Sequence, residues 1–319
     1  MKGSSVQLAA EWLRKGEVVA IPTETVYGLA GNAYNVDAIQ KIYDVKNRPL
    51  SNPLIVHALN IQQVKSLVKE FYAEAEILAK SFWPGPLTMI LPKAAIIPDI
   101  VTAGQQTVAV RVPSHPLTLE LLSLLEFPLA APSANKFNYI SPVTAEAVSE
   151  MLGNEVPYIL DGGRCQKGIE STIVSFVEKQ IKILRHGAIT EEQIESVLQK
   201  PMSEQKSSGH LHPGMFKKHY SPKTPLWLMN RNSDFTRLRF QKNIAAICFT
   251  ENFPSVPVKE KIMLSNSGDL EEAAQHLYSV LYELDKGNFD LIIAEKMPDA
   301  GLGKAMNERL IKAAHKHYN

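Results

Sequence analysis

Two cations separated by one residue, Lys46 and Arg48, stand directly before a proline. Pro49 and Pro53 lack an amide donor and favour extended backbone in the residue before each of them. The segment should therefore leave the preceding helix and present Lys46, Arg48 and Asn52 from a fixed loop. An arginine on such a loop suits bidentate capture of a phosphate or a carboxylate. Taken alone, these residues fit an anion site and a solvated basic turn equally well.

Other polar side chains recur where strands of the first part of the chain are expected to end. The basic ones are Arg111 and Arg185, and the hydroxyl and amide ones are Thr23, Thr25, Asn52, Ser133, Asn135, Ser141, Ser171 and Thr172. In a parallel-type sheet several such ends converge on one face. Taken singly, each of these residues is more often structural than functional. The same holds for a histidine at a strand end, such as His57. Together they favour a cationic hollow for nucleotide phosphates and a small polar substrate.

The elements that must position these residues alternate regularly, which predicts an α/β domain over residues 1–200. We expect strands at 18–21, 54–57, 87–91, 107–112, 129–131 and 158–160, and a hairpin at 171–177 and 180–184. Helices are expected at 6–15, 36–45, 61–67, 72–82, 117–125, 144–152 and 191–198. Serine, glycine and proline mark residues 201–224 as a linker. A smaller α/β domain follows at 225–319, with strands at 226–229, 244–248 and 291–294 and helices at 270–284 and 302–315.

Composition narrows the possible partners. The chain of 319 residues has 34 Lys+Arg and 33 Asp+Glu, a formal net charge of +1, so no global field draws it to nucleic acid or membrane. Cys165 and Cys248 form neither a metal-ligand spacing nor a disulfide framework, which fits a reducing compartment. The first residues lack the apolar core of a signal peptide, and no run of about 18 apolar residues occurs. We expect a cytoplasmic protein with no membrane partner.

Several familiar nucleotide and metal motifs are missing from the sequence. It contains no Walker A pattern, and the run Gly301-Leu302-Gly303-Lys304 fits a plain helix start better than an anion cradle. No compact carboxylate cluster could hold a metal by protein groups alone. Any Mg²⁺ is therefore expected to be carried on bound phosphates, and no organic cofactor is expected.

Three segments together resemble one family. They are residues 22–29 (PTETVYGL), Lys46-Asn47-Arg48-Pro49 with Asn52-Pro53-Leu54, and Pro132-Ser133-Ala134-Asn135. This combination resembles the YrdC-type threonylcarbamoyl-AMP synthases, whose hallmark is a Lys-x-Arg followed far downstream by a Ser-x-Asn. The resemblance covers about residues 6–200, and the linker and last domain are similar to the longer, two-domain branch. It implies a YrdC-like twisted mixed sheet with helices, plus a smaller Rossmann-like α/β C-terminal domain.

The resemblance also implies an activity. Such a nucleotidyltransferase joins L-threonine, bicarbonate or CO₂, and ATP (with Mg²⁺) into L-threonylcarbamoyladenylate and releases pyrophosphate. The product feeds N6-threonylcarbamoyladenosine formation at position 37 of tRNAs that read ANN codons. The implied partners are a downstream tRNA threonylcarbamoyl-transfer machinery, and tRNA itself is not the expected direct substrate.

The resemblance assigns roles residue by residue. Lys46 and Arg48 are the catalytic cations near the phosphates. Threonine is implied to lie among Thr25, His57, Arg111, Ala131 and Ser171. The nucleotide is implied to contact Arg48, Asn52, Thr107, Ser133, Asn135, Ser141 and Arg185. The family's linker usually reads Ser-Pro-Gly-Met-Lys-Tyr-x-His-Tyr. In this sequence His212 replaces the first serine and Phe216-Lys217 replaces the Lys-Tyr pair. His219 and Tyr220 are retained, and one or both are predicted to close over the nucleotide.

Two other functions compete with this one. An RNA-binding module for tRNA or double-stranded RNA, without catalysis, would use the same cationic hollow, although the near-neutral charge disfavours extensive phosphate contact. An ATP-dependent ligase or carbamoyl-transfer enzyme acting on another amine is the third possibility. The C-terminal domain either packs to steady the linker or acts as a lid that controls nucleotide access or product transfer, and we favour control through the linker.

Overall fold

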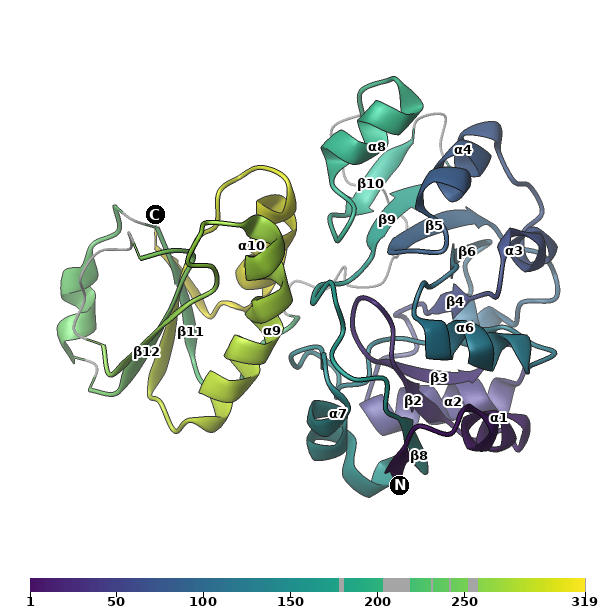
Figure 1. Ribbon diagram of the computed structural model, residues 1–319, viewed down its shortest axis with the longest axis horizontal. Helices are drawn as coiled ribbons and strands as arrows, with labels where there is room; N and C mark the ends of the chain where they lie inside the picture. The colour runs from purple at the N-terminus through teal and green to yellow at the C-terminus, as the bar shows by residue number, and fades with distance from the viewer. Residues whose placement is uncertain (178–180, 203–218, 231, 241, 252–257, 319) are drawn as a thin grey trace. The chain divides into compact units, whose positions relative to one another are not determined.

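A computed structural model describes residues 1–177, 181–202, 219–230, 232–240, 242–251 and 258–318. The chain divides into two compact units (Figure 1). The first contains Met1–Phe137, Pro142–Gln166 and Glu170–Met215, and the second contains Asn138–Ser141, Lys167–Ile169 and Phe216–Asn319. Most of the expected linker, residues 203–218, lies outside the described residues, and the altered Phe216-Lys217 pair lies there as well. Among the described helices, none has the length and apolar character needed to cross a membrane.

A mixed sheet organises the first unit. Within the described residues it has ten strands in the order β1-β8-β2-β3-β7-β4-β6-β5-β9-β10. The strands are β1 (Lys2–Gly3), β2 (Val19–Ile21), β3 (Gly28–Asn32), β4 (Ile55–His57), β5 (Leu87–Pro92), β6 (Thr107–Arg111), β7 (Leu129–Ala130), β8 (Tyr158–Leu160), β9 (Thr172–Ser175) and β10 (Lys182–Arg185). Strand β8 pairs in parallel with β1 and β2, β4 with β6, and β5 with β9, whereas the other pairs are antiparallel. The predicted twisted mixed sheet is confirmed, and within it β4 and β6 are a parallel pair whose last residues, His57 and Arg111, lie side by side.

Eight α-helices of the described residues accompany this sheet. They are α1 (Val6–Arg14), α2 (Val36–Lys46), α3 (Ile61–Leu67), α4 (Ala73–Phe82), α5 (Asp99–Thr102), α6 (Pro116–Ser123), α7 (Ala145–Leu152) and α8 (Glu191–Leu198), with a 3₁₀ turn η1 (Gly153–Glu155). Side-chain oxygens cap several N-termini, for example Asn35 on α2 and Thr144 on α7. Such caps explain why the sequence periodicity locates these helices well.

The core of the first unit forms where apolar faces of helices meet the sheet. One cluster joins α1 and α6 to strands β2, β7 and β8 through Leu13, Ile21, Leu121, Leu129 and Leu160. A second cluster lies on the other end of the sheet, over β4, β5, β6, β9 and β10. These two clusters fix the positions of the strands whose ends carry the polar residues.

The second unit is a parallel sheet with helices. Its described strands are β11 (Leu226–Met229), β12 (Ile244–Cys248), β13 (Glu260–Met263), β14 (Leu291–Glu295) and β15 (Lys316–Tyr318), in the order β13-β12-β14-β11-β15. Every pairing is parallel. Helices α9 (Leu270–Lys286) and α10 (Leu302–Ala313) pack together on one side of the strands, and the 3₁₀ helix η2 (Phe235–Phe240) lies on the other (Figure 1). This arrangement confirms the predicted Rossmann-like architecture.

Candidate active site

The Lys-x-Arg segment begins inside a helix and leaves it through a left-handed residue. Lys46 is the last residue of α2, and Asn47 caps the helix with φ 51°. The backbone N–H groups of Asn47 and Arg48 donate back to the carbonyls of Asp44 and Tyr43, at 3.1 and 2.9 Å. Asparagine tolerates this backbone conformation, which redirects the chain before Pro49.

Lys46 connects the two hallmark segments. Its side chain is buried, and Nζ donates to the carbonyl oxygens of Ser133 and Asn135. The backbone N–H of Phe137 in turn donates to the carbonyl of Lys46 at 2.7 Å. Burial, with the positive charges of Arg48 and Lys136 nearby, lowers the pKa of Lys46 well below its usual value. Hydrogen bonds from Lys46 therefore fix two segments that are far apart in sequence, the Lys-x-Arg segment and residues 133–135, against each other.

Arg48 shapes its own loop. Its Nε donates to the carbonyl of Asn52 at 3.0 Å and its Nη2 to the carbonyl of Pro53 at 2.8 Å. The hydroxyl of Tyr43 also donates to the carbonyl of Asn52, at 3.1 Å. Within the described structure, neither the oxygen nor the nitrogen of the buried Asn52 side-chain amide has a hydrogen-bond partner. A buried amide without partners is costly, so it indicates a contact that a bound ligand would complete.

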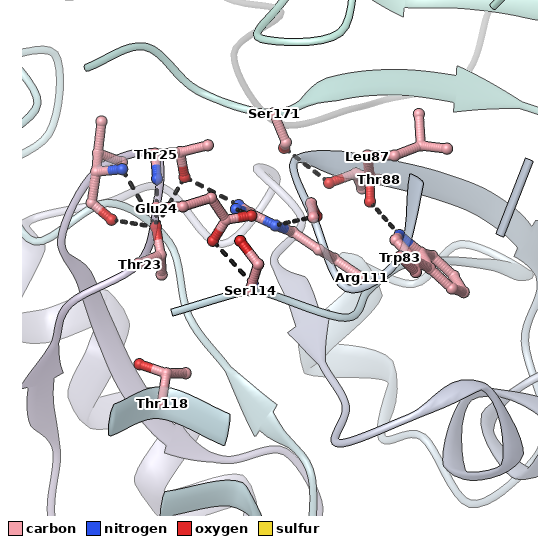
Figure 2. A network of polar contacts seen from close by, with 12 residues as sticks. Thr23, Glu24, Thr25, Trp83, Leu87, Thr88, Arg111, Ser114, Thr118 and Ser171 are labelled. Carbon is pink, nitrogen blue, oxygen red and sulfur yellow. Dashed lines mark hydrogen bonds and ion pairs between the residues drawn. The ribbon is translucent and has the colours of Figure 1, made fainter. Parts of the chain in front are cut away.

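Arg111 is the centre of a second polar network, shown in Figure 2. Its Nη2 lies 2.7 Å from Oε1 of Glu24, its Nη1 donates to the hydroxyl of Thr25 at 3.1 Å, and its Nε donates to the carbonyl of Gly85 at 3.3 Å. Both members of the ion pair are buried. Oε2 of Glu24 accepts the backbone N–H of Ser114 at 3.1 Å, so the carboxylate is fixed on both sides.

The turn that carries Glu24 and Thr25 is held by a threonine. Oγ1 of Thr23 accepts the backbone N–H groups of Thr25 and Val26, at 3.1 and 3.2 Å, and donates to the carbonyl of Val26 at 2.6 Å. Side-chain hydroxyls that form hydrogen bonds to nearby backbone in this way favour a turn and disfavour a helix or a strand. The hydroxyl-rich sequence thus fixes both side chains that contact Arg111.

His57 lies beside Arg111 because β4 and β6 are parallel and these two residues are in register. Burial and the positive charge of Arg111 lower the pKa of His57 to about 3. The imidazole is therefore neutral at physiological pH, and in the described structure its Nδ1 has no hydrogen-bond partner. It can offer a neutral hydrogen bond to a ligand but supplies no positive charge.

Four of the implied residues lie at the two ends of this strand pair. His57 and Arg111 end β4 and β6, whereas Thr107 begins β6, two residues before Ala109, which pairs with Ile55. Asn52 likewise precedes β4. Four residue steps along a strand span about 13 Å. Within β6, Thr107 of the nucleotide set and Arg111 of the threonine set therefore lie about that far apart, whereas Ala131 of the threonine set lies beside Ile55 at the start of β4.

Ser171 and Arg185 bridge these sets at the neighbouring strands β9 and β10. Arg185 donates to the carbonyl of Ser171 from Nε at 3.1 Å and from Nη2 at 2.8 Å, and Nη2 also contacts the Ser171 hydroxyl at 3.0 Å. That hydroxyl lies 2.8 Å from the hydroxyl of Thr88. One residue assigned to threonine therefore touches one assigned to the nucleotide.

Ala131 and Ser133 are held where β3, β4 and β7 meet. The backbone N–H of Ala131 donates to the carbonyl of Ile55 at 3.0 Å, and Ser133 pairs with Gly28. A Cβ added to Gly28 would lie only 3.2 Å from Cβ of Ala131, so glycine permits the close approach. Asn135 is buried beside this junction.

Three residues assigned to the nucleotide belong to the second unit: Ser141, His219 and Tyr220. The His219 and Tyr220 rings lie 4.0 Å apart. Tyr220 stacks at 5.9 Å on Tyr278 of α9, and the guanidinium of Arg309 from α10 lies 5.6 Å from its ring. Closure of His219 or Tyr220 over the nucleotide stays a prediction.

Sequence reasoning missed two polar residues of the site, Glu24 and Thr88. Glu24 stands inside the threonine-rich turn, and an acid between two hydroxyl residues was the available signal. Its pairing with Arg111, far along the chain, follows only from the sheet order. Among the described residues, no group of three or more His, Cys, Asp or Glu side chains could hold a metal ion.

Fold and site together define an α/β protein with a buried cationic centre and a separate parallel α/β domain. A family model described as "Telomere recombination" (Sua5_yciO_yrdC) matches residues 11–187, and one described as "Threonylcarbamoyl-AMP synthase, C-terminal domain" (Sua5_C) matches residues 189–315. The chain belongs to the Sua5/YciO/YrdC family.

Curated relatives extend over nearly the whole chain. A protein of Pyrococcus abyssi named threonylcarbamoyl-AMP synthase is 39% identical over 97% of this chain and 94% of its own. A Bacillus subtilis protein of the same name is 42% identical over 96% of this chain and 92% of its own. The crystal structure of P. abyssi Sua5 complexed with L-threonine superposes with a TM-score of 0.89 at 36% identity, covering 98% of this chain and 96% of that one.

Proposed function

We propose that this protein is an L-threonylcarbamoyladenylate synthase, which makes that product and pyrophosphate from L-threonine, bicarbonate or CO₂, and ATP. The observation that carries the proposal is the buried Arg111 network, because a relative of matching fold, P. abyssi Sua5, has been solved in complex with L-threonine. The names of the curated relatives support the same reaction. No observation favours the RNA-binding alternative.

Arg111 is suited to hold the threonine carboxylate. A guanidinium can form two parallel hydrogen bonds to a carboxylate, and Glu24, Thr25 and Gly85 fix its plane in advance. Such preorganisation avoids the cost of ordering a flexible side chain when the substrate binds. The neutral His57, in register beside Arg111, adds hydrogen-bonding capacity without a second charge.

The chemistry then requires two anions to approach. The threonine amine is carboxylated as the free base, and an oxygen of the resulting carbamate attacks the α-phosphorus of ATP while the bond to pyrophosphate breaks. Arg48 and the Mg²⁺ that ATP carries on its phosphates offset the negative charge that develops. The buried Asn52 amide, without a partner in the described structure, is available to the nucleotide. No covalent enzyme intermediate is needed.

Lys46 is assigned a role in positioning as well as charge. Its ammonium fixes the carbonyls of Ser133 and Asn135, and through them the Ser-x-Asn segment, against the Lys-x-Arg segment. We propose further that the product passes to a tRNA-modifying machinery, with tRNA not a direct substrate, and that the protein works in the cytoplasm.

The direct test is pyrophosphate release by the full chain with ATP, Mg²⁺ and bicarbonate, with and without L-threonine. We expect release that depends on threonine, with L-serine and other amino acids as specificity controls. Loss of dependence on threonine, with release driven by another amine, would favour the ligase alternative. The absence of any release, in a protein that still binds threonine, would contradict the proposed reaction.

A further inference from the structure

The parallel sheet of the second unit carries a pocket at the carboxyl ends of its central strands. The pocket has a volume of about 630 Å³ and is lined by the last residue of β14 and by residues that follow β11, β12 and β14: Asn230, Asn232, Phe249, Thr250, Glu295, Lys296, Met297 and Pro298. Its volume lies within the range of about 300–1,000 Å³ that is usual for small-molecule sites. None of these residues belongs to the active site described above.

The position of this pocket in the topology is informative. In the order β13-β12-β14-β11-β15, the chain passes from β12 to β13 on one side and from β14 through α10 to β15 on the other side. The connections after the neighbours β12 and β14 thus leave in opposite directions. Open parallel sheets bind ligands in the crevice at such a switch point, outside the carboxyl ends of the strands.

The walls of the pocket are held rigidly. Asn307 of α10 accepts the backbone N–H of Met297 at 2.9 Å and donates to its carbonyl at 3.1 Å. The backbone N–H of Lys296 donates to the carbonyl of Met229 at 2.8 Å. After β11, the hydroxyl of Ser233 contacts both the N–H and the side-chain oxygen of Asn230. The pocket is therefore preformed in the residues that line it.

Two buried polar groups of the pocket indicate the chemistry of its ligand. Glu295 is only 1% exposed, and its Oε2 accepts the backbone N–H of Phe249 at 2.6 Å. The Thr250 hydroxyl is buried and has no hydrogen-bond partner in the described residues. A carboxylate offers only acceptor sites, so a ligand beside it must bring hydrogen-bond donors.

The remaining lining indicates a flat, partly apolar ligand. Phe249 and Met297 are buried, and an aromatic ring with a thioether suits the face of a heterocycle. Asn230 and Asn232 add amides that can donate or accept. In dinucleotide folds, a carboxylate at a strand's carboxyl end accepts the ribose hydroxyl.

We propose that this pocket binds a ribonucleoside. Its ribose hydroxyls would contact Glu295 and Thr250, and its base would lie along Phe249 and Met297. The proposal does not depend on the reaction assigned to the first unit. It gives the C-terminal domain a ligand site of its own.

Calorimetric titration of the full-length protein with adenosine, guanosine, uridine and cytidine, each beside its 2′-deoxy counterpart, tests this proposal. We expect at least one ribonucleoside to bind, and its deoxy form to bind about tenfold more weakly, because one hydrogen bond to a charged group is lost. Thr250→Val and Glu295→Gln should each weaken binding of the ribonucleoside by a similar factor. Glutamine retains an oxygen that can accept the Phe249 N–H, and the exposed Glu251→Gln is the matched control.

Arg48→Ala locates the binding, because a nucleoside could also enter the nucleotide site of the first unit. Binding that persists in Arg48→Ala and falls in the Thr250 and Glu295 variants supports the pocket. Binding that is lost in Arg48→Ala but unchanged in both pocket variants would overturn the proposal. The absence of ribonucleoside binding at millimolar concentration, or equal affinity for the ribo and deoxy forms, would overturn it without any variant.

Discussion

The hydrogen bonds from Lys46 to the Ser133 and Asn135 carbonyls predict the effect of Lys46→Met on stability. Methionine has a similar length but no donor, so the buried carbonyl oxygen of Asn135 and the half-buried one of Ser133 lose their partner. A fully buried acceptor left without a donor costs about 1–3 kcal/mol, so the two carbonyls together cost at most roughly 2–6 kcal/mol. Removing a buried ammonium offsets part of this, since its lowered pKa shows that the fold disfavours the charged form. We expect a net loss of about 1–3 kcal/mol in the free energy of unfolding.

The pH dependence identifies the cause of that loss. The pKa of Lys46 in the folded protein is below its ordinary value of 10.5, so the unfolded chain binds more protons between the two pKa values. The free energy of unfolding of the native protein therefore rises with pH across this window. Lys46→Met should lack this part of the rise. Denaturant titrations at several alkaline pH values measure both effects.

The matched control is Lys41→Met on the same helix. Its half-exposed ammonium donates to the carbonyl of Gly16 at 3.0 Å and pairs with Glu17 at 2.8 Å, so its loss should cost about 0–1 kcal/mol. If Lys46 only contacts phosphates, Lys46→Met will lose turnover while its stability equals that of the native protein. That result would refute the positioning role.

Three further predictions concern the same unit. Glu24→Gln removes the charge that fixes Arg111 and should weaken threonine binding at least tenfold in calorimetry, with a stability loss of about 3–5 kcal/mol. Unchanged affinity would show that Arg111 needs no partner. Arg48→Ala should lower turnover at least tenfold in the pyrophosphate assay, because losing one preorganised donor costs about 2.7–4 kcal/mol, and full activity in a folded variant would remove Arg48 from the mechanism. The pKa of His57 is lowered to about 3 from 6.5, so stability present above pH 6.5 is lost as pH falls toward 3, on the order of 5 kcal/mol in total. In His57→Gln the free energy of unfolding should fall less between pH 6.5 and 3 than in the native protein. An unchanged fall would show that other groups cause it.

Much of the fold could be predicted because apolar runs and capped helices are local signals. Strand β3 was missed, since Gly28–Asn32 reads as the end of a turn and owes its strand to pairing with β2 and β7. Strands β13 and β15 were missed because Glu260–Met263 and Lys316–Tyr318 are polar edge segments. Edge strands bury little, so their sequences carry no clear alternation.

The residues of the site were easier to name than to connect. Charged and hydroxyl side chains at strand ends can be found in the sequence, and Arg111 and Ser171 are examples. The Glu24–Arg111 ion pair and the bonds from Lys46 to the Ser-x-Asn carbonyls could not be found, because both join distant segments through the sheet order. No local pattern encodes which buried donor meets which carbonyl.

The surroundings of Lys46 imply that nucleotide binding is coupled to a proton. The positive charges of Arg48 and Lys136 help lower its pKa. An arriving polyphosphate would act in the opposite direction, because an opposite charge nearby favours the protonated ammonium. Binding should then raise the pKa of Lys46, and by linkage the affinity for Mg²⁺-ATP should fall as Lys46 loses its proton. Titrations in two buffers of different ionisation enthalpy would reveal the proton taken up. The same uptake in Lys46→Met would assign it to another group, and no uptake in the native protein would place the phosphates away from Lys46.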